Sequence, residues 1–150
     1  MGVGRIYNMY GENSHVGDQQ HVVVDLMQKA IRYPQVPFDV WGDGRQSRDF
    51  LHVSDCVDAL IKLEEKACAN PVIVNIGAGK AVTIKELAER IVRISSKDIK
   101  IQYDLTKPVG PLSRTASIEK AKAVLGWEPK IGLDEGLRRT YQWLENRLSS

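Results

Sequence analysis

Two arginines are the strongest candidates for ligand binding in this sequence. Arg48 follows the Gly42-Asp43-Gly44 turn, and Arg114 lies in the proline-containing stretch 106–115. A guanidinium group presents a rigid fork of donors that matches a phosphate, and a loop or strand end is a suitable place from which to direct it at a ligand. From the local sequence alone, a surface ion pair is the commoner role for each of them.

A third polar residue, Asn8, follows a short stretch with strand propensity and comes just before Tyr10 and Gly11. Its side-chain amide can contribute to the same ligand site, although asparagine in this position more often forms a turn.

Other candidate motifs point to structure rather than to chemistry. The Gly77-Ala78-Gly79 turn has Val82 where a dinucleotide fingerprint has its third glycine, so we predict an ordinary turn between a strand and a helix. Cys56 is expected to fill the core, and we expect no catalytic residue in the chain. Metal coordination is not expected, because the three histidines lack ligand spacing: His15, His21 and His52.

Composition indicates one ordinary globular domain of 150 residues, with 43% hydrophobic and 27% charged residues. A net charge of +2 is too balanced for nonspecific binding to nucleic acid, and the apolar runs are too short for a membrane span. Cys56 and Cys68 are expected on one helix about 18 Å apart, too far for a disulfide. We therefore expect a cytoplasmic protein.

Hydrophobic periodicity predicts alternating strands and helices. Strands are expected at 3–7, 38–41, 48–53, 72–76 and 98–105, with 38–53 forming a strand, turn, strand unit, and 106–115 is expected to be a loop. Helices are expected at 22–31, from Ser54 or Asp55 to about 70, after a Thr83–Glu86 capping box, from Ser117 to Gly126, and at 133–148. In the second helix we expect Val57, Leu60 and Ile61 to face the core, with Leu63 as a further candidate.

The order of four sequence blocks indicates a family. The blocks are RIYNMYG (5–11), WGDGRQSRDFLHVSDCVDAL (41–60), VNIGAGKAVTIKELAERI (74–91) and ASIEKAKAVLGWEPKIGLDEGLRRTYQWL (116–144). Together they resemble the C-terminal half of the extended short-chain dehydrogenases, the NAD-dependent nucleotide-sugar epimerases and dehydratases, and within them most of all the sugar epimerases of the GDP-mannose 3,5-epimerase type.

The resemblance implies an α/β fold made of the last Rossmann strands and a small α/β substrate-binding domain, taken together as one domain over residues 1–150. It also implies three site residues for a nucleotide sugar: Asn8 contacts the substrate near its diphosphate, Arg48 holds a phosphate or the ribose region, and Arg114 holds the diphosphate from the opposite loop. Glu12 and Ser117 depart from the residues common at their positions, proline and aspartate, so the loop shapes and the substrate preference differ from those of many relatives.

The family places its glycine-rich NAD-binding turn and its catalytic Tyr-x-x-x-Lys pair upstream of the block that contains Asn8, and only seven residues precede Asn8 here. We therefore expect the NAD-binding domain to be absent, the chain to lack a Tyr-x-x-x-Lys pair and a cofactor of its own, and the chain to be inactive alone. Without the rest of the cofactor domain, the strands around 4–7 and 72–76 would expose unpaired backbone edges. Such edges predict a homo-oligomer or a complex with a separate cofactor-domain chain. The alternative is a noncatalytic binding or protein-interaction module derived from this family.

Overall fold

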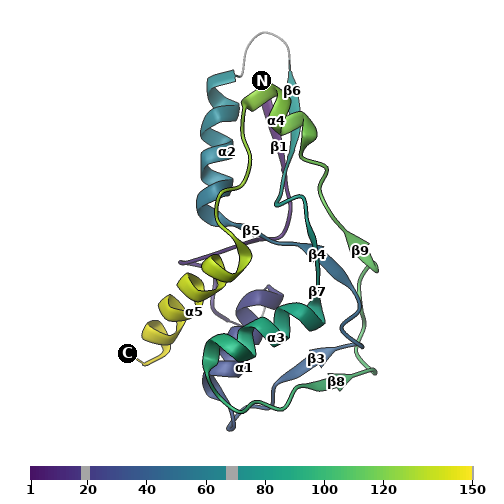
Figure 1. The fold of residues 1–150 in the computed structure, drawn as a ribbon, viewed down its shortest axis with the longest axis vertical. Coiled ribbons are helices and arrows are strands. Elements are labelled where there is room, and N and C mark those ends of the chain that lie inside the picture. The colour runs from purple at the N-terminus through teal and green to yellow at the C-terminus, as the bar shows by residue number, and fades with distance from the viewer. Residues whose placement is uncertain (18–20, 67–70, 150) are drawn as a thin grey trace.

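The computed structural model describes residues 1–17, 21–66 and 71–149. Its α/β chain forms an elongated molecule with a sheet and two helices at one end, three helices and a second small sheet at the other, and short strands between them (Figure 1). None of the helices in the described ranges is long and apolar enough to cross a membrane.

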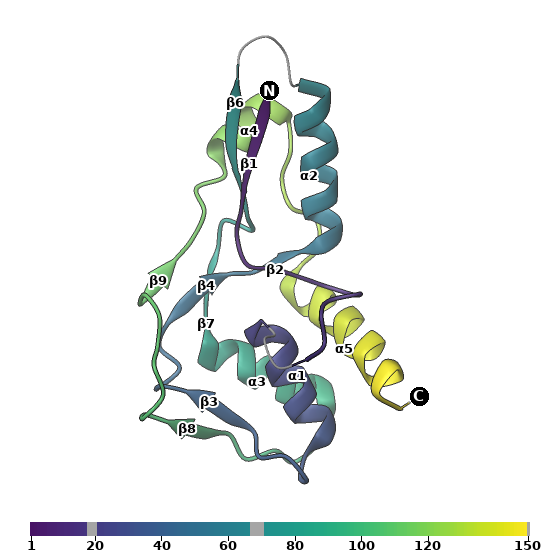
Figure 2. The same cartoon turned by 180° about the vertical axis from the view of Figure 1, so that it is seen from behind.

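The end that contains the N-terminus is built on two parallel strands. β1 (Gly2–Ile6) pairs with β6 (Val72–Ile76) along its whole length, and both lie where the sequence predicted strands. Helices α2 (Val53–Lys66) and α4 (Glu119–Leu125) pack beside them, as Figures 1 and 2 show from opposite sides. The core here contains Leu51, Cys56, Ala59, Leu63, Val74, Ile76, Ala121, Leu125 and Trp127.

The opposite end holds the larger hydrophobic core. Three helices form it: α1 (Val22–Arg32), α3 (Ile84–Ser95) and α5 (Leu133–Ser149). The strands β3 (Asp39–Trp41) and β8 (Gln102–Asp104) form a parallel pair at its edge. The capping box predicted for α3 is present, because the Thr83 hydroxyl accepts from the Glu86 amide and the Glu86 carboxylate accepts from the Thr83 amide.

Short strands connect the two ends. β4 (Ser47–Asp49) lies between β7 (Ala81–Thr83), which is antiparallel to it, and β9 (Ser113–Arg114), which is parallel to it. β2 (Met9–Tyr10) pairs in parallel with β5 (Leu51–His52). The central strand β4 therefore brings segments from three distant parts of the sequence together.

The strand, turn, strand unit predicted at 38–53 is wrong in one respect, because its two strands do not pair with each other. The strands and the turn exist, and Gly42 and Gly44 both have positive φ. However, β3 and β4 pair with different partners, and the Gly42 amide donates to Asp104 of β8 at 2.8 Å. The expected strand at 98–105 shortens to β8, and the expected loop at 106–115 contains β9. Each strand pairs with segments distant in the sequence in place of forming a local hairpin with the other.

The expected inner face of α2 is wrong for three of its four residues. Val57, Leu60 and Ile61 are 49%, 39% and 54% exposed. The predicted Leu63 is buried, and the helix packs through it and through the smaller Cys56 and Ala59, which are also buried. Small residues let the helix approach the sheet closely, and the three larger apolar residues keep much of their surface exposed.

Two predicted helix caps differ from the structure. α2 begins at Val53, and the Asp55 carboxylate accepts from the amides of Lys130 and Ile131 at 3.1 and 2.9 Å, so it fixes the segment before α5 instead of capping α2. α4 has Ile118 at its N-cap without a side-chain cap, so Ser117 does not cap it, whereas the predicted Gly126 stop is present with a left-handed conformation. Cys56 is a buried free thiol; Cys68 lies outside the described residues.

Candidate functional site

The two candidate arginines lie side by side on neighbouring strands. Arg48 of β4 and Arg114 of β9 are register partners in the parallel pairing. Directly opposed residues of a parallel pair project their side chains from the same face of the sheet. The 66 residues between Arg48 and Arg114 in the sequence therefore separate two cations that are adjacent in the fold.

Asn8 joins the two arginines. It lines a cavity of about 740 Å³ together with Arg48, and it also lines a smaller hollow of about 280 Å³ with Ile6, Tyr7 and Arg114. The Asn8 side chain donates to the Asp49 carbonyl oxygen at 3.1 Å, which fixes it beside β4. The three predicted residues are thus brought together, although the two arginines line separate hollows that share Asn8.

Both guanidinium groups keep donors available. Arg48 uses its Nη1 to donate to the carbonyl oxygens of Ser47 and Pro111, each at 2.7 Å. Within the described residues its Nε and Nη2 have no acceptor, and Arg114 has neither a hydrogen bond nor an ion pair through its side chain. The surface ion pairs that are the common role of such arginines are therefore not formed in the described part of the chain.

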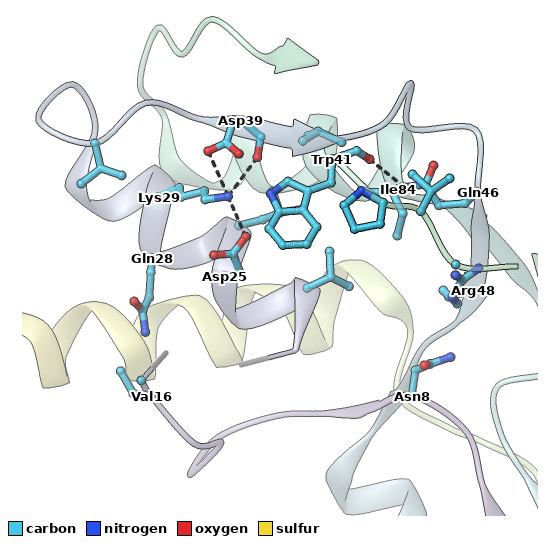
Figure 3. A pocket seen from close by; sticks show the side chains of 18 of the residues that line it. Asn8, Val16, Asp25, Gln28, Lys29, Asp39, Trp41, Gln46, Arg48 and Ile84 are labelled. Carbon is cyan, nitrogen blue, oxygen red and sulfur yellow. Dashed lines mark hydrogen bonds and ion pairs between the residues drawn. The ribbon is translucent and has the colours of Figure 1, made fainter. Parts of the chain in front are cut away.

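The larger cavity has an aromatic wall between two polar ends. Figure 3 shows Trp41 between a group formed by Asp25, Lys29 and Asp39 on one side and Arg48 with Asn8 on the other. Trp41 is 49% exposed, and the Lys107 ammonium lies 5.7 Å from the centre of its ring. An exposed indole between cationic and anionic groups offers a flat apolar surface to a planar ring.

A buried carboxylate that the sequence did not reveal holds this site in shape. Asp49 is fully buried, and its oxygens accept from the backbone amides of Ala78, Gly79 and Ala116, the last two at 2.9 and 3.0 Å. It ties β4 to the turn after β6 and to the segment after β9. The position of Arg48 and Arg114 therefore depends on a buried residue that lines neither hollow.

The same contacts decide how the Gly77–Gly79 turn can be used. A dinucleotide-binding turn needs free backbone amides to donate to a pyrophosphate. Here the amides of Ala78 and Gly79 are already bonded to Asp49, and a Cβ at Gly77 would come within 2.9 Å of that carboxylate. The turn does not fit the phosphates of NAD. It leads into the short strand β7 before α3 begins, so the predicted direct connection from a strand to a helix is wrong in that detail.

A second buried polar cluster supports the segment that follows Asn8. The His52 imidazole, with a fully buried side chain, lies 3.0 Å from Glu12, and Glu12 accepts from Arg139 of α5 at 2.9 Å. Tyr10 meets the His52 ring edge-on at 5.5 Å. Burial lowers the pKa of His52 and raises the pKa of Tyr10. Glu12 thus anchors the loop after β2 to α5.

The expectation that the chain lacks a Tyr-x-x-x-Lys spacing is wrong, because Tyr103 and Lys107 have it. The pair does not form a helical turn: Tyr103 lies on β8, and Lys107 follows a turn closed by its amide and the Asp104 carbonyl. Burial and the charge of Glu89 raise the pKa of Tyr103, whereas a tyrosine that exchanges protons near neutral pH needs a lowered one. Lys107 packs on Trp41 instead.

Among the described residues, no group of three or more histidine, cysteine, aspartate or glutamate side chains is arranged to hold a metal ion.

The chain belongs to the NAD dependent epimerase/dehydratase family, whose sequence pattern matches residues 1–77. It is 40% identical over 146 residues to a putative GDP-L-fucose synthase 2 from Arabidopsis thaliana, with 93% of this chain and 43% of that protein covered. It is 39% identical over 135 residues to UDP-glucuronic acid decarboxylase 3 from the same plant, with 90% and 38% covered. Identity to its GDP-mannose 3,5-epimerase is 31% over 147 residues, with 97% and 38% covered.

Solved structures agree with this assignment. The fold matches UDP-glucose 4-epimerase with UDP-glucose from Thermotoga maritima with a TM-score of 0.90 and 30% identity, over 98% of this chain and 46% of that one. It matches MoeE5 in complex with UDP-glucose and NAD with a TM-score of 0.85 and 29% identity, over 98% and 48%. The chain thus spans less than half the length of these relatives, and its α/β fold corresponds to their C-terminal portion.

Proposed function

We propose that this chain binds the nucleoside diphosphate part of a nucleotide sugar. Arg48 and Arg114 hold the diphosphate, Asn8 donates its amide between them, and the base stacks on Trp41. The observation that carries the proposal is the register pairing of two arginines, beside a shared asparagine, with guanidinium donors that have no acceptor among the described residues.

The charges make this site selective for a diphosphate over a neutral ligand. Each hydrogen bond between a guanidinium and a phosphate contributes about 1.5–3 kcal/mol when the charged partners are well placed. Two adjacent cations without carboxylate partners gain more from an anion that bridges both than from separate monovalent ions. The relatives named above act on GDP-sugars and UDP-sugars, which share the diphosphate and differ in the base and the sugar.

The chemistry on the sugar requires groups beyond those found in this site. Hydride exchange at a sugar carbon needs a bound nicotinamide and a residue that moves the hydroxyl proton. We propose that these come from sequence outside residues 1–150, whether in the same polypeptide or in a separate chain, and that these residues alone do not convert a sugar. A cytoplasmic location is part of the same proposal.

Titration calorimetry of the 150-residue chain with GDP, UDP, GDP-sugars and UDP-sugars tests the binding role. We expect binding that Arg48→Ala and Arg114→Ala each weaken about tenfold or more. Arg45→Ala is the matched control, because Arg45 is exposed in the same turn and pairs with Asp43 instead of lining either hollow. Equal loss in all three variants, or no nucleotide binding at all, would refute the proposal.

The exposed faces of β1 and α2 favour a partner for this chain. In the described residues β1 pairs only with β6, so its other edge has unpaired amides and carbonyls. Val57, Leu60 and Ile61 form an apolar stripe on α2, which packs on β1. We propose that the sheet of a cofactor-binding domain continues β1 and covers this stripe, since unpaired strand edges and apolar faces seek such cover.

Light scattering coupled to size-exclusion chromatography tests this second proposal. We expect the isolated chain to associate with itself through this face when no cofactor domain is supplied, and Val57→Lys with Ile61→Lys to give a monomer with unchanged secondary structure. A wild-type chain that is monomeric at high concentration, and that does not bind an NAD-binding fragment of a relative, would contradict it. Self-association that persists in the double variant would place the interface elsewhere and favour the noncatalytic oligomeric module.

A further inference from the structure

The acidic end of the larger cavity has a defined structure that the diphosphate does not explain. Lys29 of α1 lies 2.8 Å from Asp25 and 3.1 Å from Asp39, and it also donates to the Asp39 carbonyl oxygen at 3.1 Å. An ammonium group has three donors. All three are therefore used within this group, and Lys29 has no donor left for a ligand.

The carboxylate of Asp39 keeps an acceptor facing the cavity. Lys29 contacts its Oδ1, and within the described residues Oδ2 has neither a hydrogen bond nor an ion pair. Its side chain is 31% exposed, and Asp39 and Trp41 are two positions apart on β3, so both project from the same face while Val40 between them is buried in the core. A ring stacked on Trp41 therefore has its edge directed toward Asp39.

The other charged groups at this end do not neutralise the acceptor. Asp25 adds a second carboxylate, and Arg32 lines the cavity from an exposed position without an ion pair to either one. Although burial acts to lower the pKa of Lys29, its hydrogen bonds and charge interactions with Asp25 and Asp39 raise it, so it stays protonated as an anchor. This end of the cavity presents acceptors and selects a ligand edge that carries donors.

Building on the function proposed above, we propose that Asp39, held in place by Lys29, contacts the base and selects guanine, so that the nucleotide sugar is a GDP-sugar. Guanine presents two adjacent donors, N1–H and the 2-amino group, on its Watson–Crick edge. One of them matches the unpartnered Oδ2, and the other matches the lone pair of Oδ1 that Lys29 leaves. Uracil presents a single N–H between two carbonyl oxygens, and those oxygens would face the carboxylate. The diphosphate then lies toward Arg48 and Asn8, on the other side of Trp41 (Figure 3).

Competition among GDP, UDP and inosine diphosphate tests this inference on the unmodified chain. Inosine diphosphate retains the N1–H of guanine but lacks the 2-amino group, so it removes one donor without changing the diphosphate. We expect GDP to bind about tenfold or more tightly than both UDP and inosine diphosphate. Equal affinity for GDP and inosine diphosphate would overturn the two-donor contact even if no variant folds.

Asp39→Asn supplies the complementary test, since it keeps the size of the side chain and places an amide donor against the base. We expect the preference for GDP over UDP to disappear, because GDP binding weakens about tenfold while UDP binding changes less than about threefold. Asp43→Asn is the control, because Asp43 is exposed and lies outside the cavity lining. Wild-type binding of GDP and UDP with equal affinity would overturn this inference and leave the proposed function standing. Binding of neither would overturn both.

Discussion

Replacement of Asp49 by alanine would test whether one buried carboxylate holds the site together. The variant leaves three backbone amides, of Ala78, Gly79 and Ala116, without their acceptor. A buried donor that loses its partner costs about 1–3 kcal/mol. The Ala116 amide is buried, and the Ala78 and Gly79 amides are partly buried. We expect about 3–5 kcal/mol, a large fraction of the 5–15 kcal/mol typical of a domain of this size.

Urea denaturation followed by far-UV circular dichroism at pH 7 measures this loss. Asp49→Asn should cost less than Asp49→Ala, because the Asn carbonyl oxygen still accepts from part of the set. Asp98→Ala is the matched control: Asp98 is exposed, and its replacement should change stability by less than about 0.5 kcal/mol. A loss below about 1 kcal/mol for Asp49→Ala would refute the reasoning, since it would mean that water or relaxation satisfies the three amides without the carboxylate.

Three further predictions follow from local contacts. Burial lowers the pKa of His52, so the unfolded chain binds more protons than the folded chain once the pH falls below the ordinary histidine pKa of about 6.5. The free energy of unfolding should therefore decline as the pH falls from there. His52→Gln should flatten this decline in urea denaturation measured at several pH values. Gly136→Ala should destabilise by about 1–3 kcal/mol in thermal melts despite the better helix propensity of alanine, because the new Cβ would collide with the Tyr10 hydroxyl and His52. Thr83→Ala should cost about 1 kcal/mol by the same melts through loss of the α3 capping box, and an unchanged melting temperature would contradict it.

Local signals in the sequence were enough to predict most of the elements. The Thr83–Glu86 box fixes the start of α3, Gly126 ends α4, and β1 and β6 form where strands were expected. These features depend on residues a few positions apart, or on short runs of residues with strand propensity.

Features that depend on distant contacts were not predicted. The separation of β3 from β4 follows from the pairing of β3 with β8, about 60 residues later in the chain, which no local pattern contains. The bonds of Asp49 also cross 29 to 67 residues. The apolar side of α2 was assigned to the core because periodicity identifies a stripe without saying what covers it.

Parts of the site itself were predicted from residue type, and other parts were not. Guanidinium chemistry and the family resemblance led to Arg48, Arg114 and Asn8, which the fold brings together. Their roles in binding remain predictions. Trp41 and Asp39 were not singled out as site residues, although alternation along β3 places both on the side opposite the buried Val40 and was the signal available in the sequence.

The pairing of β4 with β9 spans only two registered residue pairs, yet it closes a loop of more than sixty residues. So short a pairing contributes few hydrogen bonds against the entropy of ordering that loop, so the junction relies on added bonds such as those of Asp49 to Ala116 and of Arg48 to Pro111. An anion that bridges Arg48 and Arg114 would hold β4 and β9 together. At a concentration one hundred times its Kd such a ligand adds about 2.7 kcal/mol to the folded state, so occupancy of the site and protection of the β9 amides from hydrogen exchange should rise together.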